Sequence, residues 1–177
     1  MSVWPFEQNA LKSVGEALEI AEDRTGDFYK YSLGQWKRHR YDIKTGCQLS
    51  KEERATSAFA LLHKYSRSSC GSAFQTREED FYFICLQDHQ ILRALQRDKM
   101  LRLLPLLIYI FTHELVHIVR FCNFSERFEI TGEGRDREEG IVHATTYDIL
   151  RKLSMLHMDY ILDAYKGHRI CDMALSC

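Results

Sequence analysis

The chain has 177 residues, 45% of them hydrophobic and 12% aromatic, and its formal net charge at pH 7 is −1. That hydrophobic content is enough for one compact domain over residues 1–177 and argues against a disordered chain. A charge so close to zero gives no reason to expect a nucleic acid or an anionic membrane as the partner.

Two further features of the sequence predict a cytoplasmic protein. The first residues, Met-Ser-Val-Trp-Pro-Phe-Glu-Gln, lack the basic and then apolar segments of a secretory signal peptide. The six cysteines form no Cys-x-x-Cys pair, as expected of reduced thiols. The most apolar stretch, residues 103–111, is much shorter than the roughly twenty residues that cross a bilayer, so no membrane span is expected.

Apolar residues at helical spacing predict two helices in the first third of the chain. The first covers residues 7–22 and is expected to end at residues 25–27, which include a glycine. The second is expected over residues 51–65, because Ser50 followed by Glu53 has the pattern of a capping box. The basic segment between them is expected to be a solvated loop or helix face.

One segment favours a strand, and the rest of the chain favours helices. Residues 80–87 are dense in aromatic and other β-favouring residues. The predicted fold is mainly α, or α+β with at most a small sheet around residues 81–86. Further helices are expected over residues 88–102, from 104 or 105 to about 121, over 136–153 and over 155–165, with loops at 66–72 and 124–136.

The helix predicted to end near residue 121 contains His113-Glu-Leu-Val-His117, an HExxH motif. Residues i and i+4 share one face of a helix, so the two imidazoles point to one place and Glu114 flanks it. Two neutral imidazoles can bind Zn²⁺, and Glu114 is placed to accept a proton from a metal-activated water. The surrounding residues are uncharged, so the motif enters a core where it needs a partner: a metal, or else ordinary core hydrogen bonds.

Through this motif the chain resembles the zincin metallopeptidases, which carry HExxH within an uncharged helix. Metzincins have a glycine three residues after the second histidine and a third histidine three residues later, where this chain has Arg120 and Asn123. The gluzincin branch instead takes its third metal ligand from a glutamate about twenty residues downstream, and Glu139 lies there. The resemblance implies a zincin-like domain around a central motif helix. It also implies a strand that pairs with extended substrate, for which residues 81–86 are the candidate.

The sequence leaves the third metal ligand open. Glu139 and His143 lie one turn apart on one face of the helix predicted over residues 136–153. Either Glu139 binds the metal and His143 supports it, or His143 binds and Glu139 orients its other nitrogen. Glu138 points about 100° away and would bind only if the helix were rotated. Gluzincins carry an aspartate where this chain has His143.

These residues predict a hydrolase: a zinc-dependent metallopeptidase acting on a peptide or protein, with Glu114 as general base. One alternative is a non-haem di-iron carboxylate oxidoreductase, which needs two Glu-x-x-His copies where the chain has one. Another is a catalytically silent metal-binding regulatory protein, against which Glu114 argues. The transition state also needs a group that stabilises negative charge, and Tyr147, His157 and Tyr160 are nearby in sequence.

Overall fold

The computed structural model describes residues 5–66, 80–123, 131–166 and 171–176, the last six and Ser66 by their backbone alone. The fold in these ranges is mainly helical with a small sheet, as predicted. The helices are α1 (Gln8–Tyr29), α2 (Leu33–Trp36), α3 (Asp88–Arg97), α4 (Leu103–Asn123), α5 (Glu133–Leu150) and α6 (Met158–Ala164). The strands are β1 (Tyr41–Lys44), β2 (Ala60–Ser66), β3 (Asp80–Leu86) and β4 (Cys171–Ser176), and a 3-10 helix, η1, spans Gly46–Gln48.

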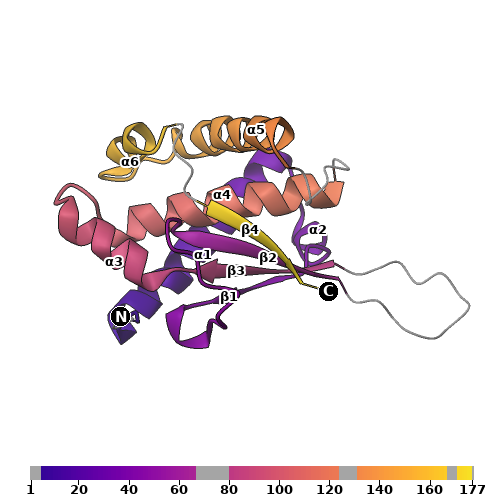
Figure 1. The fold of residues 1–177 in the computed structure, drawn as a ribbon. Coiled ribbons are helices and arrows are strands. Elements are labelled where there is room, and N and C mark those ends of the chain that lie inside the picture. Colours follow the sequence, from indigo (N-terminus) through magenta and orange to yellow (C-terminus); the bar gives the residue numbers. More distant parts are fainter. Residues whose placement is uncertain (1–4, 67–79, 124–130, 167–170, 177) are drawn as a thin grey trace, which may run out of the picture.

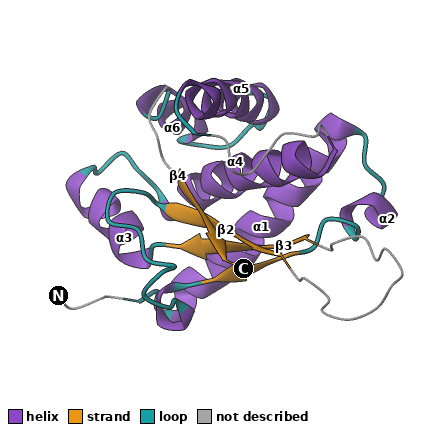
Figure 2. Ribbon diagram, turned by 45° about the vertical axis from the view of Figure 1, so that its right-hand side comes forward, coloured by secondary structure: helices purple, strands orange, loops and turns teal. Residues whose placement is uncertain are grey.

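The strands form one sheet in the order β1-β3-β2-β4 (Figure 1). β3 is antiparallel to β2 and parallel to β1, and β4 is parallel to β2. Helices α1 and α4 lie against one face of the sheet, while α5 and α6 lie beyond the edge formed by β4 (Figures 1 and 2). Helix α4 is therefore enclosed by the sheet, by α1 and by the α5–α6 pair.

Helix α4 is the centre of the core, as the sequence predicts for the motif helix. Every residue from Pro105 to Val119 is buried. A helix that is covered on all sides needs no solvated polar face, which explains why α4 is apolar apart from a few residues around the motif. By length and composition α4 also qualifies as a membrane span, but most of it lies inside the fold. The strand residues buried in the same cluster are Ala60, Leu62, Tyr82, Ile84 and Leu86.

The helix predicted over residues 51–65 is wrong, because turns lead into strand β2 there. The contact on which it rested does exist: the Ser50 amide donates to the Glu53 carboxylate at 2.9 Å. The same carboxylate also accepts hydrogen bonds from Lys44 Nζ and from the Tyr65 hydroxyl. Those partners belong to β1 and β2, so the carboxylate ties the turn to the sheet instead of starting a helix.

Helix α1 runs past the end predicted at residues 25–27 and stops at Tyr29. Gly26 does not break it, because its role is close packing. A Cβ atom added at Gly26 would lie 2.5 Å from Nε1 of Trp36. The chain leaves the helix at Lys30, which adopts the left-handed conformation with φ 58°.

The strand predicted at residues 80–87 is confirmed as β3, but its expected role is wrong. β3 is hydrogen-bonded to β1 on one side and to β2 on the other. A strand with both edges occupied cannot add an extended substrate. Residues 81–86 therefore form the interior of the sheet, not a substrate-binding edge.

The remaining predicted helices are confirmed with shifted ends. α3 ends before residue 102, because the chain turns where the Asp98 carboxylate accepts a hydrogen bond from the Met100 amide at 2.9 Å. α5 is shifted toward the N-terminus, and α6 is shorter than predicted. Of the loop expected at 66–72, Ser66 belongs to β2 and the rest lies outside the described residues, as do residues 124–130 of the loop expected at 124–136.

Replacement of two glycines of α1 by alanine should change the stability of the protein in opposite directions. Gly26→Ala should lower the free energy of unfolding by about 1–3 kcal/mol, because the new methyl group displaces Trp36. Gly15→Ala should raise it by up to about 1 kcal/mol, because a Cβ there meets nothing within 4 Å and alanine favours the helix. Urea denaturation of both variants checks this. Similar values for the two would contradict the packing role of Gly26.

Candidate metal centre

The two motif histidines lie at the buried core of α4. His113, Glu114 and His117 are all 0% exposed. The i, i+4 spacing puts both imidazoles on the face of α4 that meets α5, with ring centroids 4.9 Å apart. Helix α4 thus carries two adjacent nitrogen donors into a region without solvent.

Helix α5 brings Glu139 to both histidines. One carboxylate oxygen lies 3.4 Å from Nε2 of His113 and the other lies 3.4 Å from Nε2 of His117. Within the described part of the chain, no hydrogen bond reaches the ring nitrogens of these histidines or the Glu139 oxygens, although all are buried. Buried polar atoms of this kind normally have a partner, so the group has the character of an incomplete coordination site.

The spacing of these atoms fits a zinc site. In a tetrahedral site with metal–ligand bonds of about 2.0–2.1 Å, two ligands lie roughly 3.4 Å apart. The distances from Glu139 to the two histidines have this value. Two imidazoles and one carboxylate are also a ligand set that Zn²⁺ uses in catalytic sites.

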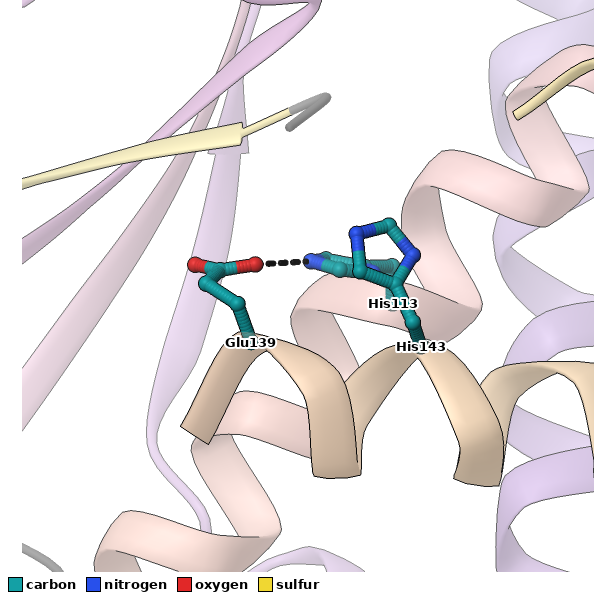
Figure 3. A group of neighbouring side chains, drawn as sticks. All are labelled: His113, Glu139 and His143. Carbon is teal, nitrogen blue, oxygen red and sulfur yellow. Dashed lines mark ion pairs between the residues drawn. The ribbon is translucent and has the colours of Figure 1, made fainter. Parts of the chain in front are cut away.

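His143 completes the group from the next turn of α5. Its ring centroid lies 4.7 Å from that of His113, and donor atoms of His113, Glu139 and His143 all lie within 4.8 Å of one another. Figure 3 shows Glu139 and His143 projecting from α5 toward His113 on α4. Nδ1 of His143 is 3.2 Å from the Tyr109 hydroxyl. Both predicted third ligands are thus close to the motif, but Glu139 contacts both motif histidines.

Glu138, the other alternative, is occupied elsewhere. Its two carboxylate oxygens accept hydrogen bonds from Arg120 Nε at 2.6 Å and Nη2 at 2.7 Å. This two-pronged pair joins α5 to the end of α4 and holds Glu138 away from the histidines. The orientation of α5 thus favours Glu139 over Glu138.

The protonation states of the group suit a cation. Burial lowers the pKa of His113 to about 3, although the Glu139 carboxylate opposes the shift. Burial by itself would raise the pKa of Glu139, but the imidazoles of His113 and His117 hold it well below its usual range. At neutral pH, His113 therefore offers the free lone pair of one ring nitrogen, and Glu139 offers a negative charge, which is the state that binds a metal.

The residues considered for transition-state stabilisation lie in three different places. Tyr160 donates a hydrogen bond to Asp98 at 2.6 Å, and His157 precedes the first turn of α6. Tyr147 lines a cavity that also reaches His143. The residue missed in the sequence is Tyr109. It lies four residues before His113 on α4, so helical spacing alone would have indicated its place beside the group.

No family model, no curated protein and no solved structure matches this chain. The resemblance to zincins therefore remains a prediction from the motif. The side chains of the centre are therefore the basis for a proposed function.

Substitutions at the adjacent residues Glu138 and Glu139 should have different effects, one on stability and the other on metal binding. Glu139→Gln should weaken Zn²⁺ binding by about 100-fold or more, because a neutral amide replaces the charged donor. Glu138→Gln should keep zinc affinity but lower the free energy of unfolding by about 2 kcal/mol, because Arg120 loses its charged partner. Zinc competition with a chromophoric chelator and urea denaturation measure the two effects. Loss of zinc in Glu138→Gln alone would indicate a rotated α5.

Acid should destabilise the metal-free fold through His113. In the unfolded chain this histidine takes up a proton near its ordinary pKa of about 6.5, but in the fold it does so only near 3. Between these values the unfolded state binds more protons, so stability falls as the pH falls, by at most about 1.4 kcal/mol per pH unit. With a chelator present, the urea concentration at the unfolding midpoint should decrease when the pH is lowered from 6.5 to 5. The decrease should be smaller in His113→Gln. Equal falls would contradict this role for His113.

Proposed function

We propose that this protein is a zinc-dependent metallopeptidase with a zincin-like site. The observation that carries the proposal is the Glu139 carboxylate, whose two oxygens lie 3.4 Å from Nε2 of His113 and of His117. Two imidazoles and a carboxylate leave one position open in a tetrahedral site, as catalytic zinc requires. The ligands proposed are His113, His117 and Glu139, with His143 as the alternative third ligand.

The residues of the chain take distinct roles in this reaction. When bound, Zn²⁺ supplies a Lewis acid that polarises the peptide carbonyl and makes water a better nucleophile. Glu114, which lies about 100° around α4 from His113, accepts the proton of the attacking water and then donates it to the leaving amine. His143 and Tyr109, joined at 3.2 Å, border the same group and orient one another.

The two other functions have weaker support. A di-iron oxidoreductase takes carboxylates and histidines from four helices. In the part of the chain that is described, the donors come from α4 and α5 alone. A purely structural metal site has no use for an acid next to an open position, which argues against a catalytically silent protein. A peptide or protein substrate and a cytoplasmic location remain part of the proposal.

Glu114→Gln tests catalysis apart from metal binding. The zinc content should stay at that of the unchanged protein, because Glu114 is not proposed as a ligand. Hydrolysis of fluorescein-labelled casein should fall by roughly 100-fold or more, because the general base is lost. Glu16→Gln, on the exposed side of α1, is the control and should leave both unchanged.

Two results would overturn the proposal. If zinc-loaded protein cleaves neither labelled casein nor a mixed peptide library, the chain is not a peptidase. If Glu114→Gln loses the metal as completely as His113→Ala does, Glu114 is a ligand, and the di-iron alternative gains support.

A further inference from the structure

We propose that substrate reaches the metal centre through the cavity between α5 and α6, and that this cavity binds a peptide segment with an uncharged, apolar side chain. This inference rests on the proposed peptidase function and adds a route and a substrate class to it. The cavity has a volume of about 730 Å³, which is within the range of cavities that hold small ligands.

The burial of the donors decides the route. His113, Glu114 and His117 are 0% exposed, so none of them meets solvent directly. Glu139 and His143 line the cavity between α5 and α6 and contact His113 from there. A second cavity, between α1 and β1, contains none of these residues. Of these two cavities, the one between α5 and α6 therefore offers a ligand the approach to the donors, past Glu139 and His143.

The wall formed by α5 has room for a ligand. Gly140 and Ala144 line the cavity in successive turns, beside Glu139 and His143. A Cβ added at Gly140 meets nothing within 4 Å, so the space next to this helix is open. Glu139 itself is 9% exposed, and although its oxygens lie 3.4 Å from the two imidazoles, no contact within the described residues has the geometry of a hydrogen bond to them. A polar side chain so deeply buried at the end of a cavity points to a bound group there.

The other side chains that line the cavity indicate which kind of ligand side chain it would bind. Tyr109, Tyr147 and Leu162 supply apolar surface. Besides Glu139, whose charge is assigned to the metal, two carboxylates and one ammonium line the cavity: those of Asp136, Asp148 and Lys166. Asp148 forms an ion pair with Arg151 at 3.0 Å. The remaining charges, one negative and one positive, roughly cancel. A wall without net charge favours an apolar side chain over a cationic or anionic one.

Cobalt-substituted protein allows a test that does not depend on turnover, because the visible spectrum of bound Co²⁺ reports ligands of the metal. The probes are acetohydroxamate, which has no side chain, and the hydroxamates of Leu-Leu and of Leu-Lys. The unchanged protein should bind Leu-Leu hydroxamate at least about tenfold more tightly than acetohydroxamate, because the cavity buries the leucine side chains. Leu-Lys hydroxamate should bind more weakly than Leu-Leu.

Gly140→Phe fills the cavity without changing a donor. It should abolish the preference for Leu-Leu hydroxamate and leave the affinities for Co²⁺ and acetohydroxamate within about twofold. Gly15→Phe, at an equally open site on α1, is the matched control and should change none of these. Tyr147→Ala is a second variant, because this side chain is 43% exposed and its loss should not unfold the protein. Tyr147→Ala should weaken the binding of Leu-Leu hydroxamate and leave the affinities for Co²⁺ and acetohydroxamate unchanged.

The outcomes separate the two proposals. If the unchanged protein takes up no Co²⁺ or Zn²⁺, the metallopeptidase proposal fails. If it binds the metal and the hydroxamates, but Gly140→Phe and Tyr147→Ala keep the full preference for Leu-Leu, the cavity is not the route and only the further inference fails. If Leu-Lys hydroxamate binds more tightly than Leu-Leu hydroxamate, the cavity does not favour an apolar side chain.

Discussion

The structure depends on one unfavourable arrangement, a carboxylate buried against two imidazoles between α4 and α5. Removing such groups from water is costly unless they find partners, and no surface water is available to His113 or His117. The surrounding packing holds them in place nonetheless. Val142, Ile149 and Leu150 of α5 join the same apolar cluster as α4, so the helices stay together around the polar group. A cation would turn this costly interface into a favourable one, since it offsets the charge of Glu139 and occupies the imidazole lone pairs.

The main parts of the centre could be predicted because they depend on local spacing. The i, i+4 relation fixes His113 beside His117, and the same relation puts Glu139 beside His143 without any knowledge of the fold. Which of Glu138 and Glu139 faces the motif histidines could not be fixed in the same way. That depends on the rotation of α5, which is set by Arg120, a residue on another helix.

The sheet was predicted poorly for a physical reason. Strand β2 is covered on both faces, by the main core at Leu62 and by a smaller cluster at Leu61, so its sequence lacks the alternation that marks a half-buried strand. The pattern at Ser50 and Glu53 correctly predicts a contact but wrongly predicts a helix, because the other partners of Glu53 come from strands β1 and β2. Pairing between strands is a non-local property, and a single sequence read by periodicity does not contain it.

The ion pair between Arg120 and Glu138 has a consequence for how the centre assembles. A helix can turn about its own axis without losing its internal hydrogen bonds, and a turn of about 100° would exchange one residue of α5 for its neighbour. The Arg120 guanidinium donates one hydrogen bond to each oxygen of the Glu138 carboxylate, and this two-bond geometry restricts the angular position of α5. Arg120 therefore sets the rotational phase of α5, and through it the position of the neighbouring carboxylate. A pair of side chains that touches none of the donors thus helps to select which carboxylate of α5 faces the motif histidines.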